Sequence, residues 1–149
     1  MNEKLVRLLK NKNLKIAAAE SCTGGAFMAS IVKVPGASGV LPGGLVTYCD
    51  DAKVNQLGVN KEIIKIFGAV SREVAIEMAM EVRIKFGADV GVAVTGFAGP
   101  DGDRVGEVHF AISVKNEAFH TMRRFVGISR SEVIDTSVTF LTEWLCEKV

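Results

Sequence analysis

The sequence predicts an α/β protein, a three-layer α/β/α sandwich built around a mixed, mostly parallel sheet. Three observations lead to this fold class. Candidate strands and helices alternate along most of the 149 residues. The apolar, β-branched run at residues 90–95 is typical of a central strand covered on both faces. Two strand-like segments, 107–114 and 119–126, flank a polar turn at 115–117, which indicates a hairpin and hence one antiparallel strand.

The predicted elements follow one another in the order α-β-α-β-α-α-β-β-β-α. Leu5, Leu8 and Leu9 recur at helical spacing among charged residues, which predicts an amphipathic first helix. Ser71 is expected to cap a helix over 72–86 that stops at Gly87, and Ser129 with Glu132 forms a capping box for a last helix over 130–148. The remaining predicted elements are strands at 15–19 and 45–49, helices at 26–32 and 51–57, a capped turn at 60–67, and loops at 34–44 and 96–106.

Composition restricts the class of protein. Hydrophobic residues make up 48% of the chain, and we expect residues 1–149 to form one domain. The 18 basic residues nearly balance the 17 acidic ones, without a basic stripe, so we expect no nucleic-acid partner. Charges interrupt the N-terminal segment throughout, which speaks against a signal peptide, and no run reaches about 18 apolar residues, which speaks against a membrane partner. Three cysteines without CxxC spacing favour reduced thiols in the cytoplasm, and the apolar content favours a homodimer.

Three predicted strand ends carry residues of chemical interest, and ligands of open α/β sheets bind at the carboxyl ends of strands. The three segments are ESCTGG at 20–25, YCDDAK at 48–53 and TGFAGP at 95–100. Glycine lets a ligand approach the backbone closely. Free N–H groups at the start of the helix after Ser21 would offer a site for an anion or an oxyanion.

Ser21 is the candidate nucleophile, and a serine hydroxyl needs a base. Both histidines, His109 and His120, fall in the predicted hairpin, so a lysine with a lowered pKa, assisted by tyrosine, is the candidate base. Tyr48 and Lys53 lie five residues apart across a strand-to-helix turn. Taken one at a time, Ser21 is explained equally well as a helix N-cap, a tyrosine at the position of Tyr48 is more often a strand-end aromatic, and a lysine like Lys53 is most often a solvated helix residue. Cys22 has no histidine beside it and fits a small buried thiol.

Taken together, the strand-end motifs resemble the CinA C-terminal, or competence-damage-inducible, family. The matching segments are AESCTGG at 19–25, VPGAS at 34–38, GGxVxYxxxAK at 43–53, GAVS at 68–71, GAD at 87–89 and AVTGxAGP at 93–100. The resemblance covers nearly the whole chain and corresponds to the stand-alone version of the domain. It implies a three-layer α/β/α fold with a mixed sheet.

The resemblance also implies an activity, the hydrolysis of nicotinamide mononucleotide to nicotinic acid mononucleotide and ammonia in pyridine nucleotide salvage. The catalytic residues of the family fall on Ser21, Tyr48 and Lys53. We expect no metal and no organic cofactor, since paired aspartates such as Asp50 and Asp51 are commoner as loop and cap residues. The residues expected to contact substrate are Cys22, Thr23, Gly24, Gly25, Thr95, Gly96 and Arg130, with Arg130 or Arg104 expected at the phosphate.

The chain departs from the family pattern at three places. Cys49 and Asp50 follow Tyr48, where Ser-Asn is usual, and Asp50 would favour the charged form of Lys53. Ile134 stands where many members carry a second arginine at the start of the last helix, and the loop after Pro100 is shorter. These departures leave two alternatives open, a nucleotide-binding module without catalysis and a serine amidase for another small amide.

Overall fold

The computed structural model describes residues 1–149, and its five strands form one sheet in the order β2-β1-β3-β4-β5. The strands are β1 (Ile16–Glu20), β2 (Gly43–Val46), β3 (Val90–Gly96), β4 (Glu107–Val114) and β5 (Glu117–Arg124). β1 pairs in parallel with β2 and β3, whereas β4 pairs antiparallel with β3 and β5. Only β4 therefore runs against the other strands, which confirms the predicted mixed, mostly parallel sheet.

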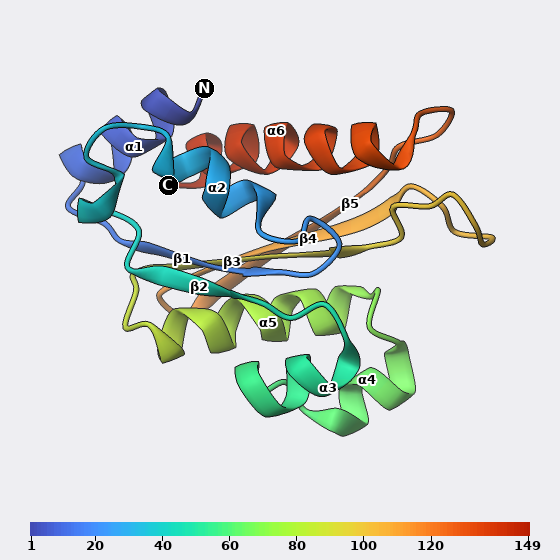
Figure 1. Ribbon diagram of the computed structural model, residues 1–149. Helices are drawn as coiled ribbons and strands as arrows, with labels where there is room; N and C mark the ends of the chain where they lie inside the picture. The colour runs from blue at the N-terminus through green and yellow to red at the C-terminus, as the bar shows by residue number, and fades with distance from the viewer.

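Helices cover both faces of the sheet, as Figure 1 shows. One face carries α1 (Asn2–Asn11), α2 (Ala26–Val32) and α6 (Arg130–Lys148). The other carries α3 (Asp50–Ala52), α4 (Lys61–Phe67) and α5 (Arg72–Lys85). The predicted α/β/α sandwich is therefore confirmed. None of the helices is long and apolar enough to cross a membrane.

Two apolar cores lie on opposite sides of the sheet. Because successive strand residues point to opposite faces, neighbours in β1 and β3 contribute to different cores. Ile16 and Val92 pack with α1, α2 and α6, whereas Ala17 and Ala93 face α5. The sheet residues under α5 are small because α5 lies very close to the sheet. A Cβ on Gly91 would lie 1.9 Å from the carbonyl oxygen of Ala79 in that helix.

The second strand corrects the sequence prediction. β2 spans Gly43–Val46 rather than 45–49, and the predicted loop at 34–44 also contains a short 3₁₀ helix, Ala37–Gly39. The two glycines are strand residues because the sheet leaves no room there: a Cβ on Gly44 would lie 2.2 Å from the carbonyl oxygen of Ala18 and 2.5 Å from Met28 Sδ. Tyr48 consequently lies beyond the strand, in the segment that leads to α3.

The helix ends follow their local signals closely. The Ser71 hydroxyl accepts a hydrogen bond from the Val74 N–H, and Ser129 with Glu132 forms the expected capping box. The hairpin turn is shorter than predicted, because β5 already begins at Glu117 and Lys115 adopts a positive φ of 54°. These local signals place α5 and α6 so that their first turns lie at the carboxyl end of the parallel strands.

Candidate active site

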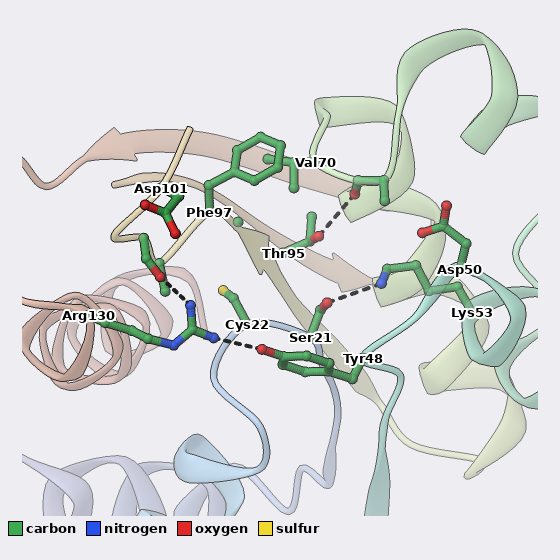
Figure 2. Close-up of a pocket in the computed structure, with 14 residues that line it drawn as sticks. Ser21, Cys22, Tyr48, Asp50, Lys53, Val70, Thr95, Phe97, Asp101 and Arg130 are labelled. Carbon is green, nitrogen blue, oxygen red and sulfur yellow. Dashed lines mark hydrogen bonds between the residues drawn. The ribbon is translucent and has the colours of Figure 1, made fainter. Parts of the chain in front are cut away.

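The carboxyl ends of β1, β2 and β3 meet the first turn of α6 around a cavity of about 310 Å³. Figure 2 shows the side chains that line it. Its lining residues are Ser21, Cys22, Tyr48, Asp50, Lys53, Ala69, Val70, Thr95, Gly96, Phe97, Ala98, Gly99, Asp101 and Arg130. Ser21, Tyr48 and Lys53, separated along the chain, therefore share one cavity, and its size suits a small molecule.

Ser21 and Lys53 are in direct contact. The Lys53 Nζ donates to Ser21 Oγ at 3.0 Å and to the carbonyl oxygen of Thr47 at 2.8 Å. Both side chains are buried, with 7% of Ser21 and 1% of Lys53 exposed. Lys53 opens a π-helical turn, Lys53–Leu57, that continues α3, and such turns often occur at functional sites. The helix predicted at 51–57 is thus present, but its residues from Lys53 to Leu57 form a π-helical turn instead of an α-helix.

Burial lowers the pKa of the Lys53 ammonium below its ordinary value of 10.5. The negative charge of Asp50 opposes this shift by raising the pKa, and the thiols of Cys49 and Cys22 raise it further, to a smaller extent, when they are ionised. The opposing effect of Asp50 agrees with the sequence prediction. A lowered pKa increases the fraction of neutral amine, which is the form that accepts a proton from a serine hydroxyl.

Cys22 lies beside Ser21 but is unsuited to nucleophilic attack. Burial raises the pKa of its thiol to about 12, so the thiol keeps its proton at neutral pH. Its N–H donates to no backbone oxygen of the protein and contacts only the thiol of the same residue. That N–H is therefore available to donate to an oxygen atom bound next to Ser21.

The start of α2 corrects a second expectation, that of free N–H groups for a ligand. The carboxylate of Glu20, which is fully buried, accepts hydrogen bonds from the Thr23 hydroxyl and from the N–H groups of Gly25, Phe27 and Met28. A helix N-terminus attracts an anion, and here the chain supplies its own. Thr23, Gly24 and Gly25 accordingly lie outside the cavity lining.

Tyr48 occupies the rim of the cavity. Its side chain is 59% exposed, and its hydroxyl accepts a hydrogen bond of 2.7 Å from Nη2 of Arg130. Arg130 also donates to the carbonyl oxygen of Gly99, so it links α6 to the loop after β3. No hydrogen bond joins Tyr48 to Ser21 or Lys53, which differs from the pairing expected for a shared proton transfer.

The comparisons with known proteins agree on one family. The model of the CinA C-terminal domain matches residues 1–149. The chain belongs to the CinA C-terminal domain family. A CinA-like protein of Kosmotoga olearia is 44% identical over 149 residues, which cover 97% of this chain and 36% of the relative. A CinA-like protein of Dictyoglomus turgidum is 40% identical over 131 residues, 85% of this chain and 32% of the relative. The chain thus spans about one third of the length of these curated relatives.

Solved structures of CinA proteins share the whole fold. The CinA superfamily protein of Klebsiella pneumoniae matches with a TM-score of 0.95 at 31% identity, over 99% of this chain and 94% of that one. The competence/damage inducible protein CihA of Agrobacterium tumefaciens matches with a TM-score of 0.89 at 38% identity, over 97% and 93% of the two chains.

Within this CinA fold, Thr95 and Gly96 line the cavity as expected, but the Thr95 hydroxyl is already engaged. It donates to the carbonyl oxygen of Ala69 at 2.9 Å and is almost fully buried. Thr95 can therefore accept a hydrogen bond from a ligand, while its hydroxyl proton is already engaged by Ala69. Ala69 and Val70 form a wall that the sequence did not reveal, although the Ser71 cap that follows them marks the end of their loop.

The remaining candidates lie outside the cavity. Arg104 pairs with Glu107, donates to the carbonyl oxygen of Val70 and covers the ring of Phe97, so Arg130 is the arginine that lines the cavity. His109 bonds to His120 and Glu107 within the hairpin, as the sequence placed both histidines. Ile134 packs against the apolar core under α6.

Proposed function

We propose that this chain hydrolyses the carboxamide of nicotinamide mononucleotide, giving nicotinic acid mononucleotide and ammonia. The observation that carries the proposal is the 3.0 Å contact between Lys53 Nζ and Ser21 Oγ inside the cavity. The serine–lysine pair supports acyl transfer as the reaction class. The resemblance of the AESCTGG and AVTGxAGP motifs to the family supports nicotinamide mononucleotide as the substrate.

In the acylation step, neutral Lys53 takes the proton of Ser21 Oγ while that oxygen attacks the carboxamide carbon. The Cys22 N–H donates to the oxygen that becomes negative in the tetrahedral intermediate. The Lys53 ammonium then passes its proton to the departing nitrogen. Ammonia leaves, and the acyl group remains on Ser21 as an ester.

In the deacylation step, water attacks the ester carbon and Lys53 accepts the proton of that water. The intermediate collapses, the bond to Ser21 Oγ breaks, and Lys53 returns the proton to Oγ. Nicotinic acid mononucleotide leaves, and both residues regain their starting states. In this scheme Tyr48 and Arg130 act at the rim, and we expect the exposed guanidinium of Arg130 to bind the phosphate of the substrate.

Ammonia release from nicotinamide mononucleotide tests the proposal. We expect Ser21→Ala to lower the rate at least about a thousandfold while the circular dichroism spectrum stays unchanged. Ser38→Ala, at an exposed serine outside this cavity, serves as the matched control and should keep the parent rate. A Ser21→Ala protein that releases ammonia at the parent rate would contradict the proposal.

The same assay separates the two alternatives. Nicotinamide and pyrazinamide carry the ring and the amide without ribose phosphate, so faster turnover of these compounds would favour an amidase for another substrate. Calorimetric binding of the mononucleotide without ammonia release would favour a binding module.

A further inference from the structure

Two aromatic side chains border the part of the cavity that lies between Ser21 and Arg130. Figure 2 shows Tyr48 on one side of this space and Phe97, with Val70, on the other. Both aromatic residues line the cavity, and 59% of Tyr48 and 39% of Phe97 is exposed. Aromatic surface left open at a small-molecule cavity gains free energy when a ligand covers it.

The protein holds Phe97 in place without any ligand. Its N–H donates to the carbonyl oxygen of Glu107 at 2.9 Å, and its own carbonyl oxygen accepts from the Gly106 N–H at 2.7 Å. The Arg104 guanidinium covers its ring from outside the cavity, with Cζ 5.1 Å from the ring centroid. Arg104 is itself fixed, because its Nε donates to Glu107 Oε2 at 2.9 Å and its Nη2 donates to the carbonyl oxygen of Val70 at 3.0 Å. A side chain anchored in this way loses little conformational entropy when a ligand binds to it.

The proposed reaction brings the ring of the substrate into this same space. The carboxamide carbon has to reach Ser21 Oγ, and we expect the phosphate at Arg130. The pyridine ring bears the carboxamide on a carbon and the ribose phosphate on its nitrogen, so it lies between these two ends. There it has Phe97 on one side and Tyr48 on the other. Aromatic rings in contact stabilise each other in offset-stacked or edge-to-face arrangements, which an aliphatic amide cannot form.

We propose that Phe97 determines specificity for a planar ring, so that the substrates of this site are aromatic carboxamides. Phe97 stands at the position that the AVTGxAGP motif leaves open. The inference rests on the proposed function, since Ser21 and Arg130 set the two ends between which the ring lies. Phe97 contacts the ring and not the bond that breaks, so it acts in binding rather than in proton transfer.

Two ligands isolate the contribution of the ring. Nicotinamide mononucleotide carries the ring, and ribose 5-phosphate carries the sugar and the phosphate without it. Dissociation constants are measured by NMR titration in a Ser21→Ala background, which prevents turnover. Phe97→Leu removes the aromatic ring but keeps an apolar side chain, and Phe97→Tyr keeps the ring. Phe119→Leu is the matched control, because Lys148 Nζ lies 4.8 Å from the Phe119 ring centroid, and Phe119 belongs to β5 and does not line this cavity.

We expect Phe97→Leu to weaken binding of the mononucleotide about three- to tenfold and to leave binding of ribose 5-phosphate unchanged. Phe97→Tyr and Phe119→Leu should change neither dissociation constant. Equal weakening of both ligands by Phe97→Leu, or no weakening of the mononucleotide, would overturn the assignment.

The NMR signals of the bound mononucleotide supply a second readout, which a purely structural role of Phe97 would not affect. An aromatic ring shifts the signals of protons that lie close to it. We expect binding to shift the signals of the pyridine protons, and Phe97→Leu to remove part of that shift while the shifts of the ribose protons stay the same. Pyridine shifts that are identical in the two proteins would overturn the contact.

Failure of this inference and failure of the proposed function are read in separate assays. No ammonia from the mononucleotide contradicts the hydrolase function, whereas the binding measurements use a protein without its nucleophile and test Phe97 alone. In the active protein, Phe97→Leu should raise KM for the mononucleotide and leave kcat nearly unchanged. Absence of mononucleotide binding would overturn both the function and the role of Phe97.

Discussion

Replacing Glu20 by glutamine tests how the turn that carries Ser21 is held. The two carboxylate oxygens of Glu20 accept four hydrogen bonds at 2.6 to 3.1 Å, three on Oε2 and one, from the Met28 N–H, on Oε1. Glutamine keeps one acceptor oxygen and presents an NH₂ group in place of the other. Even in the better orientation, the Met28 N–H then faces a donor.

The expected loss follows from these contacts. A buried donor left without a partner costs about 1–3 kcal/mol, and loss of the carboxylate from a helix N-terminus costs about 0.3–1 kcal/mol. We therefore expect Glu20→Gln to lower the free energy of unfolding by about 2–3 kcal/mol and Tm by roughly 5–10 °C. Urea unfolding followed by circular dichroism measures the first quantity, and a thermal melt measures the second.

Glu132→Gln is the matched control for this measurement. Glu132 also accepts a hydrogen bond at a helix N-terminus, from the Ser129 N–H, but it does so on the surface. Solvent can replace that contact, so its loss should be clearly smaller. If Glu20→Gln were no less stable than Glu132→Gln, the buried carboxylate would not be the group that holds the turn.

Three further predictions concern the base, the hairpin and the sheet. Lys53→Met should lower kcat/KM at least about a thousandfold in the ammonia assay. Burial lowers the pKa of Lys53 in the folded protein, so between that lowered pKa and 10.5 Lys53 is more protonated in the unfolded chain than in the folded one. In this pH window the free energy of unfolding of the parent protein, relative to that of Lys53→Met, should therefore rise with pH. The slope should be at most about 1.4 kcal/mol per pH unit. The hydrogen bond from Arg104 lowers the pKa of Glu107 from 4.5 to about 2. Above pH 4.5, Glu107→Gln should therefore unfold with a free energy about 1 kcal/mol lower than the parent protein, after solvent screening, and this difference should disappear as the pH falls toward 2. The added Cβ of Gly44→Ala would press on the carbonyl oxygen of Ala18, so this variant should lose about 1–3 kcal/mol of unfolding free energy in urea. An unchanged free energy of unfolding would mean that β1 and β2 can move apart to make room.

The elements that could be predicted from the sequence depend on local physics. The caps at Ser71 and Ser129 are satisfied within three residues, so both helix starts are readable from the chain alone. β2 could not be placed in this way. Gly43 and Gly44 look like loop residues in isolation, and only the contact of Gly44 with Ala18 and Met28 shows why a strand needs glycine there.

In the candidate site, too, residues in local motifs could be predicted from the sequence, whereas long-range contacts could not. Motifs pointed to Ser21 and Lys53, and carboxyl-end topology explains why segments so far apart in the chain converge. The contact between Tyr48 and Arg130 spans 82 positions and could not be inferred from either segment. Nor could the role of Glu20, because its acceptors are used only once α2 folds back over the end of β1.

Glu20 and Arg130 together bear on how a mononucleotide would enter this cavity. The N-terminus of α2, directly behind Ser21, would ordinarily attract a phosphate, but Glu20 fills it with a buried negative charge. If the proposed function holds, the phosphate of the mononucleotide would be disfavoured next to the start of α2 and attracted to the exposed guanidinium of Arg130 at the rim. That distribution of charge favours entry with the carboxamide first, toward Ser21 and Lys53. Reversing the sign at the rim, with Arg130→Glu, should therefore raise KM for the mononucleotide far more than KM for an amide without phosphate, and an equal rise for both would contradict this orientation.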